Sequence, residues 1–277
     1  FMSALGLTIP GHSETFPQYI ISMSPSITEV LFAIGLENRI VGVTEFCQYP
    51  EKAKMLPKVG GLLNPNAEQI ISLHPDLLVY HYDSYKIARF AKQLGINTLE
   101  VSFDDLDSIF RSIQKVGDVT GNSGQARILI NHLRNQISFF YDQLKTLPPR
   151  STLLVLGDSQ NPMRDLYAVG KGTFLDELLT IAGGDNIVKD SPTLYPKVSR
   201  EFIIAHSPEV ILVAGPKADL VEKDFKKHMR AWQKLSTVRA IKNQEIHYIG
   251  ADYILIPGPR LIHIINQFSK ALYPNIF

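Results

Sequence analysis

Short apolar runs alternate with stretches of helical periodicity along most of the chain. Turn residues bound the apolar runs, which are Tyr19–Ile21, Ile40–Val43, Leu77–Val79, Leu153–Leu156, Val210–Val213 and Ile246–Ile249. Apolar residues recur with the helical period in Ser26–Ile34, Ile87–Leu94, Leu106–Val119, Phe174–Ala182 and Arg260–Leu272. Buried strands that alternate with amphipathic helices are typical of parallel sheets covered by helices, so we predict an α/β fold.

One segment of the first half recurs in the second half. Asn66–Val79 aligns without a gap to Ser199–Leu212. Each copy contains, in order, a residue suited to cap a helix, an acidic residue in the first turn (Glu68 or Glu201), an Ile-Ile pair, a proline and an apolar run. The shared order predicts that the same helix–strand unit occurs twice.

A second pair of segments supports two related halves. Thr28–Val41 parallels Asp176–Val188, and in both a short helix is predicted to end at a glycine, which readily adopts the left-handed conformation of a helix C-terminus. Because both pairs occur in the same order along the chain, chance similarity is a poor explanation. We therefore predict two homologous Rossmann-like lobes, each with a mainly parallel sheet.

The segment between the two halves carries a single helical stripe. Its apolar positions are spaced alternately by four and three residues, at Ala126, Ile130, Leu133, Ile137, Phe140 and Leu144. Glycines precede the stripe and two prolines follow it, so we predict one long amphipathic α-helix of about 30 Å. This helix would join an N-terminal lobe (residues 1–122) to a C-terminal lobe (148–277), with 123–147 as a rigid connector.

The composition of the chain limits the classes of molecule that the protein is expected to bind. Of the 277 residues, 45% are apolar and 20% are charged, and 28 basic side chains nearly balance 27 acidic ones. The charged residues form no basic block, so a nucleic-acid partner is not expected. Cys47 is the only cysteine, which excludes an intrachain disulfide. No apolar run reaches the ~18–20 residues that span a bilayer.

An ordered set of short motifs resembles one family. In the first half the motifs are Ile21–Glu29 (ISMSPSITE), Val41–Thr44 (VGVT), Cys47–Pro50 (CQYP), Val59–Gly61 (VGG) and Pro75–Leu77 (PDL). In the second half they are Gly172–Asp176 (GTFLD), Ala182–Ile187 (AGGDNI), Tyr195–Glu201 (YPKVSRE) and Pro257–Arg260 (PGPR). Together they resemble the substrate-binding proteins of ABC importers for vitamin B12, ferric siderophores and haem, from about Tyr19 to Leu272.

The resemblance implies an architecture and a role. In that family two α/β lobes joined by one long helix hold a ligand in the cleft between them, outside the cytoplasm. We therefore expect a periplasmic protein, or one anchored on the outer face of the cytoplasmic membrane, that is monomeric and not an enzyme. It would deliver a corrinoid to an ABC permease–ATPase complex, with haem or a ferric siderophore as the alternative ligand. No intrinsic cofactor and no metal site are expected.

The resemblance also implies which residues meet the ligand and the permease. Vitamin B12-binding members line the cleft with aromatic rings, and the corresponding or neighbouring positions here are Tyr49, Leu62, His81, Tyr82, Tyr195, Asp252 and Tyr253. Leu62 and His81 stand where those members have tryptophans, and Tyr82 offers replacement surface nearby. The family also carries one acidic residue on each lobe that pairs with arginines of the permease. Those positions match Glu68 and Glu201.

Two other chemistries receive little support from the sequence. Asp158 and Ser159 follow a predicted strand in a block similar to the nucleophile block of GDS-type esterases, but the later Asp-x-x-His of those enzymes is absent around His263. A serine-dependent hydrolase is therefore a remote alternative. The eight histidines are scattered without the spacing of a zinc site, so no metal ion is predicted.

Overall fold

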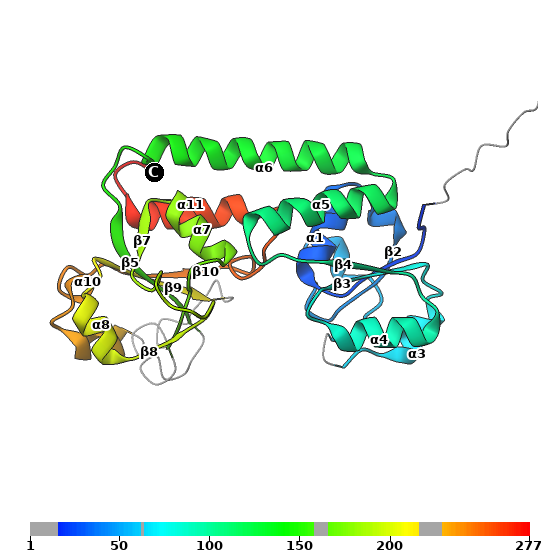
Figure 1. The fold of residues 1–277 in the computed structure, drawn as a ribbon, viewed down its shortest axis with the longest axis horizontal. Coiled ribbons are helices and arrows are strands. Elements are labelled where there is room, and N and C mark those ends of the chain that lie inside the picture. The colour runs from blue at the N-terminus through cyan, green and yellow to red at the C-terminus, as the bar shows by residue number, and fades with distance from the viewer. Residues whose placement is uncertain (1–15, 62–63, 158–165, 216–228) are drawn as a thin grey trace, which may run out of the picture.

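Two α/β lobes lie side by side beneath one long helix (Figure 1). The computed structural model describes residues 16–61, 64–157, 166–215 and 229–277. The long helix, α6 (Ser123–Leu144), runs over both lobes and packs against α5 (Leu106–Thr120), α7 (Phe174–Ile181) and α11 (Leu261–Leu272). The predicted fold, two α/β lobes joined by one long helix, is confirmed.

The N-terminal lobe is built on a parallel sheet of four strands in the order β2-β1-β3-β4. The strands are β1 (Ile20–Ser22), β2 (Ile40–Val43), β3 (Leu77–His81) and β4 (Thr98–Val101). The remaining helices of this lobe are α1 (Pro25–Ala33), the 3-10 turn η1 (Glu37–Arg39), α2 (Glu51–Lys54), α3 (Ala67–Ser72) and α4 (Tyr85–Leu94). Helices α1 and α5 cover the sheet face toward α6, and α3 and α4 cover the opposite face (Figure 1).

The C-terminal lobe repeats this layering around a mixed sheet in the order β10-β9-β5-β6-β8, with β7 paired to β5. Its strands are β5 (Arg150–Leu156), β6 (Leu166–Ala168), β7 (Gly184–Asn186), β8 (Lys197–Val198), β9 (Val210–Gly215) and β10 (Ile246–Gly250). Its further helices are α8 (Arg200–His206), the 3-10 turn η2 (Gln233–Leu235) and α10 (Arg239–Lys242). β6 is antiparallel to both β5 and β8, whereas β5, β7, β9 and β10 pair in parallel. The sheets are therefore mainly parallel, as predicted.

Alternate strand positions point to opposite sheet faces and divide the described interior into three cores. The largest core is continuous through both lobes and the linker, and includes Val79 of β3, Ile130 of α6 and Leu154 of β5. Two smaller cores lie on the other sheet faces, around Ile70 in the N-terminal lobe and Ile203 in the C-terminal lobe. The layers next to α6 thus form one packed body, while the layers farthest from it are separate.

The internal repeat is visible in the backbone. The helix N-caps, Asn66 and Ser199, each accept a hydrogen bond from the N–H three residues on, at 3.0 and 3.2 Å. Both helices are followed by a non-glycine residue in the left-handed region, His74 with φ 47° and Ser207 with φ 42°. Each unit then continues into a central strand, β3 or β9. The predicted equivalence of α3 and α8 is confirmed.

Candidate ligand-binding cleft

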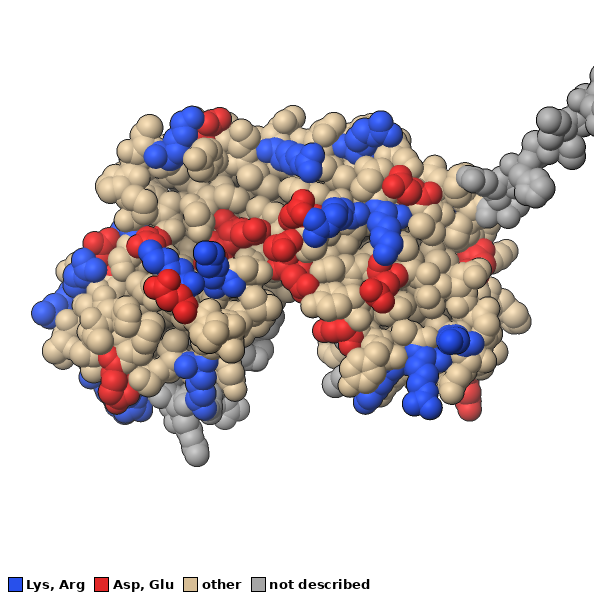
Figure 2. Space-filling view, viewed as in Figure 1, with Lys and Arg blue, Asp and Glu red and all other residues tan. Residues whose placement is uncertain are grey.

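A deep notch separates the two lobes on the side away from α6 (Figure 2). The loop residues that the sequence pointed to cluster at one edge of each sheet. Tyr49 follows β2, His81 ends β3, and Asp252 and Tyr253 follow β10. These are the carboxyl ends of parallel strands, the edge at which open α/β sheets bind ligands. Acidic side chains gather where the lobes join above the notch (Figure 2).

A buried ion pair joins the lobes at the base of the cleft. Arg260, just before α11, donates from Nε and Nη2 to the two carboxylate oxygens of Glu29 in α1, at 2.9 and 2.6 Å. The Arg260 and Glu29 side chains are 10% and 2% exposed. Arg260 Nη1 also donates to Asp252 Oδ2 at 2.7 Å, and that carboxylate is 60% exposed. A two-pronged guanidinium–carboxylate contact of this kind is strong and directional.

Burial and the charge of the partner shift the pKa of each of these two side chains in opposite directions. Loss of water raises the pKa of the Glu29 carboxyl, and the hydrogen bonds and positive charge of Arg260 offset part of the rise. Burial also opposes the charge on Arg260, but its contacts with Glu29 and Asp252 raise the guanidinium pKa overall. The buried Glu29 carboxylate therefore depends on Arg260 to offset the cost of its charge.

Two tyrosine rings flank the same guanidinium. The Arg260 guanidinium carbon lies 4.0 Å from the ring centre of Tyr49 and 5.3 Å from that of Tyr253. A cation placed over an aromatic face is attracted to it. Tyr49 is 45% exposed, so one part of the residue is covered, with Arg260 over its ring, and the rest faces solvent. The sequence offered no signal for this arrangement, because Glu29 and Arg260 lie 231 residues apart.

A second cluster surrounds Asp104, which follows β4. His81 Nδ1 lies 2.9 Å from Asp83, and its Nε2 accepts the backbone N–H of Phe103 at 3.4 Å. His81 Nε2 also lies 3.7 Å from Asp104 Oδ1. A hydrogen bond to Asp104 raises the pKa of the Tyr82 hydroxyl.

Asp104 also connects the N-terminal lobe with Tyr195 and Phe174 of the other lobe. Burial, and then the charge of Asp104, raise the pKa of the Tyr195 hydroxyl. The Phe174 N–H at the start of α7 donates to the Asp104 carbonyl at 2.6 Å. Close by, the Leu106 N–H donates to Glu177 Oε2 at 2.7 Å. Sequence reasoning missed Asp104, although its place after a parallel strand is a usable signal.

Some predicted positions fall outside the described residues. These are Leu62 of the expected ligand contacts, and Asp158 and Ser159 of the hydrolase alternative. Within the described ranges, no group of three or more His, Cys, Asp or Glu side chains could hold a metal ion. The described cleft contains rings, carboxylates and one imidazole, which suits recognition of a ligand with flat faces and polar edges.

The expected docking carboxylates lie far from the cleft floor. Glu68 of α3 and Glu201 of α8 are both exposed. Figure 1 places α3 and α8 on the side opposite α6, one on each lobe. Hydrogen bonds from the Glu201 backbone and the Ser199 hydroxyl lower the pKa of the Glu201 carboxyl, so it is charged at neutral pH.

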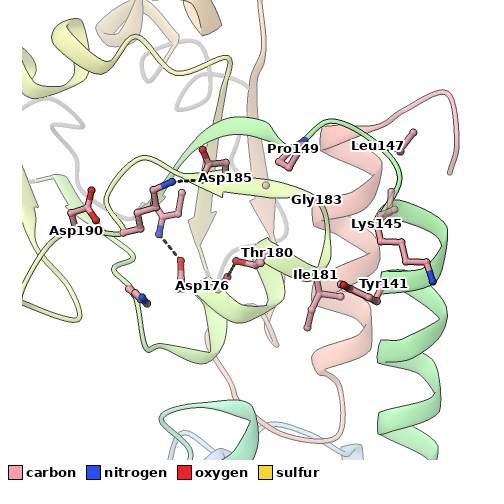
Figure 3. A pocket seen from close by; sticks show the side chains of 15 residues that line it. Tyr141, Lys145, Leu147, Pro149, Asp176, Thr180, Ile181, Gly183, Asp185 and Asp190 are labelled. Atoms are coloured by element: carbon pink, nitrogen blue, oxygen red, sulfur yellow. Dashed lines mark hydrogen bonds and ion pairs between the residues drawn. The ribbon is translucent and has the colours of Figure 1, made fainter.

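A cavity of about 620 Å³ lies elsewhere, between the end of α6, helix α7 and strand β7 (Figure 3). Several of its polar side chains are paired with one another or with neighbours. Asn186 Nδ2 donates to Asp176 Oδ1 at 2.7 Å, and Lys189 Nζ donates to Asp185 Oδ1 at 2.8 Å. Lys145, at the other end, binds Asp142. The cavity is lined by other residues than those of the cleft.

Two lobes, one linking helix and a cleft lined from both sides define a two-lobed solute-binding protein. Residues 20–253 match the family model described as periplasmic binding protein, and the chain belongs to that family. It is 30% identical to the uncharacterized ABC transporter substrate-binding lipoprotein YvrC of Bacillus subtilis (strain 168), over 94% of this chain and 82% of that one. It is 27% identical to the vitamin B12-binding protein of Photorhabdus laumondii, over 94% and 89%.

Solved structures agree with this assignment. A periplasmic haem-binding protein from Pseudomonas aeruginosa superimposes with a TM-score of 0.80 at 25% identity, covering 94% of each chain. The periplasmic vitamin B12 binding protein BtuF of Vibrio cholerae superimposes with a TM-score of 0.76 at 26% identity, covering 92% and 96%. The predicted family is confirmed: the chain is a substrate-binding protein of the ABC importer class.

Family membership also fixes the compartment. The protein works outside the cytoplasm, in the periplasm or anchored on the outer face of the cytoplasmic membrane, as expected. None of the helices in the described ranges combines the length and apolar character needed to cross a bilayer.

Proposed function

We propose that this protein captures a corrinoid in the cleft between its lobes and delivers it to an ABC permease–ATPase complex. The main support is the position of partly exposed tyrosines on both lobes: Tyr49 and Tyr82 on one, Tyr195 on the other. Flat amphipathic rings bind the faces of a macrocycle with little loss of side-chain entropy. Asp104 and Asp252 offer acceptors for the amides at a corrin edge. Relatives named as vitamin B12-binding proteins support the same choice.

The proposed contacts are those that the resemblance implied. They are Tyr49, Leu62, His81, Tyr82, Tyr195, Asp252 and Tyr253, with Leu62 resting on the resemblance alone. Arg260 is not among them, because three of its N–H groups are already bound to Glu29 and Asp252. We also propose that the functional lobes are residues 1–122 and 148–277, with 123–147 as the connector, and that the protein acts as a monomer.

Titration calorimetry with cyanocobalamin tests the ligand. We expect one molecule bound per chain, with binding weakened by Tyr49→Ala and by Tyr195→Ala. No heat of binding with the wild-type protein would refute the corrinoid assignment. Light scattering during gel filtration would report the oligomeric state with and without the ligand.

Haem or a ferric siderophore is the second candidate. The structural similarity to a periplasmic haem-binding protein favours it, and a tyrosine phenolate can serve as an iron ligand. Absorbance spectra after incubation with haemin or with a ferric hydroxamate separate the two options. A shifted Soret band with haemin, together with no binding of cyanocobalamin, would replace the corrinoid by haem.

Delivery to the permease is proposed through Glu68 and Glu201. Both carboxylates are exposed on equivalent helices, so each can pair with a cation on one half of a two-fold permease. Glu68→Gln/Glu201→Gln should retain ligand affinity and reduce uptake by reconstituted vesicles. Equal uptake by the double variant and the wild type would exclude the docking role.

We also propose that the protein has no enzymatic activity. Ester hydrolysis that is lost in Ser159→Ala would overturn this part of it and favour the hydrolase alternative.

A further inference from the structure

Two isoleucines are exposed at equivalent positions of the repeat. Ile71 of α3 and Ile204 of α8 are 48% and 46% exposed. The residues that precede them, Ile70 and Ile203, are fully buried and belong to the cores of their lobes. Of each Ile-Ile pair, therefore, one side chain stabilises the lobe and the other faces solvent.

Each exposed isoleucine lies beside a carboxylate. Glu68 and Ile71 are three residues apart on α3, and Glu201 and Ile204 are three residues apart on α8. Side chains with this spacing are neighbours on one face of a helix. Each lobe thus presents an acidic and an apolar group together. We call these pairs the Glu68–Ile71 patch and the Glu201–Ile204 patch.

Helix stability does not account for these isoleucines. β-branched side chains lose rotamer freedom in a helix, and a solvent-facing position is better served by alanine, lysine or glutamate. A single exposed apolar residue needs no explanation. Two with nearly equal exposure, at matching places in two lobes, are better explained by a shared surface function.

The two patches lie on helices that occupy the same side of the molecule. Figure 1 shows α3 and α8 on the side opposite α6, one on each lobe, and Figure 2 shows the notch between the lobes on that side. The matching caps at Asn66 and Ser199 give the two helices the same start. A partner that contacts both patches must therefore offer two similar surfaces that span the cleft mouth.

We propose that Ile71 and Ile204 are the apolar halves of a two-point docking surface for the permease. This inference rests on the proposed function and extends it from the two carboxylates to the isoleucines. The partner would offer, at two symmetric points, a cation beside an apolar side chain. The carboxylates would guide the encounter, while burial of the isoleucines would slow dissociation. Glu68 and Glu201 would repel an anionic lipid surface, whereas the basic side chains that Figure 2 shows on the same side of both lobes would attract it, so liposomes are included in the test.

Binding of the protein to its cognate permease–ATPase complex in nanodiscs tests the proposal. About half of each isoleucine surface remains to be buried, so Ile71→Ala and Ile204→Ala should each weaken docking about three- to tenfold. The double variant should lose about ten- to a hundredfold, because the sites are distant and their effects add. The loss should appear as faster dissociation and persist at high salt, whereas the effect of Glu68→Gln/Glu201→Gln should shrink with salt.

A matched control is available on the opposite side of the molecule. Ile128 of α6 is 64% exposed, so Ile128→Ala removes a similar side chain away from both patches. This variant should dock like the wild type. Ile71→Leu/Ile204→Leu, which retains apolar surface, should dock nearly as well. All variants should unfold at the wild-type temperature and bind cyanocobalamin as the wild type does.

The outcomes separate this inference from the proposed function. If the wild type docks and Ile71→Ala/Ile204→Ala docks equally well, the isoleucines have no docking role and the proposed function stands. If the wild type does not dock at all, both proposals fail. If the double variant loses binding to protein-free anionic liposomes instead, the patches bind lipid and the permease assignment is overturned.

Discussion

Replacing Arg260 with methionine should destabilise the protein strongly and in a pH-dependent way. Methionine retains much of the apolar stem but removes the guanidinium. The Glu29 side chain, 2% exposed, then loses its buried cation. Asp252 is 60% exposed and can be solvated without it. The cost therefore comes mainly from Glu29.

The size of the effect follows from the geometry. Removing one partner of a buried ion pair costs about 3–5 kcal/mol, because the remaining charge stays buried. The Tyr49 ring also loses a cation at 4.0 Å, a contact worth about 1 kcal/mol. Protonation of Glu29 and packing of the methionine recover part of the loss. We expect the free energy of unfolding to fall by about 3 kcal/mol at neutral pH, a large share of the 5–15 kcal/mol typical of a folded domain.

The pH dependence has a definite sign. Burial raises the Glu29 pKa in the folded protein above 4.5, and in Arg260→Met no guanidinium offsets the rise. A carboxyl with a raised folded pKa contributes stability below its unfolded pKa and loses it as the pH rises through the folded value. Arg260→Met should therefore approach the wild type near pH 4.5 and fall behind it toward neutrality.

Urea unfolding followed by far-ultraviolet circular dichroism, at pH 4.5 and at neutral pH, measures these differences. Arg260→Met/Glu29→Gln should recover most of the lost stability at neutral pH, because no buried carboxylate is left. Asp252→Asn is the control and should change stability by less than about 1 kcal/mol, since it removes an exposed partner. A loss below about 1 kcal/mol in Arg260→Met, or no recovery in the double variant, would refute the reasoning.

Three further predictions follow from the site and the fold. Tyr49→Ala and Tyr195→Ala should each weaken cyanocobalamin binding about thirty- to a hundredfold by calorimetry, whereas Tyr141→Ala, on the exposed surface of α6, should not. X-ray scattering profiles with and without ligand should nearly superimpose. A large change in the radius of gyration on binding would show that the two lobes are not held rigidly together. Cys47 is fully buried, so a thiol reagent should label it only when the protein unfolds, and rapid labelling of the native state would contradict that burial.

The elements found from the sequence are those specified by local signals. The helix cap at Ser199, the glycine at Gly183 and the stripe of α6 each act within a few residues, and each appears where it was predicted. β4 and β7 were not among the predicted strands, and neither were β6 and β8. β6 and β8 contain three and two residues, too few for a periodic pattern. Their antiparallel pairing, of β6 with β5 and of β8 with β6, depends on these neighbouring strands rather than on their own sequence.

The site was predictable only in outline. The resemblance indicated Tyr49 and Tyr253, but not that both rings contact Arg260. In the sequence, Arg260 stands out only as the end of the PGPR motif and the start of a helical stretch, and Glu29 only as the end of the ISMSPSITE motif. A pairing across 231 residues is set by how the lobes pack, which no local pattern encodes.

The contacts at the base of the cleft limit how the protein can respond to a ligand. The layers next to α6 share one core, and the Glu29–Arg260 pair and the Asp104–Phe174 hydrogen bond cross between lobes beside it. A wide hinge motion would break these buried contacts together and expose both charges of the ion pair. We therefore expect movement to be limited to small rotations of the outer layers, which have separate cores. These layers carry α3 and α8, so ligand binding can alter the spacing of the two proposed docking patches only slightly. A permease that distinguishes the loaded from the empty protein must detect that small change or contact the ligand itself.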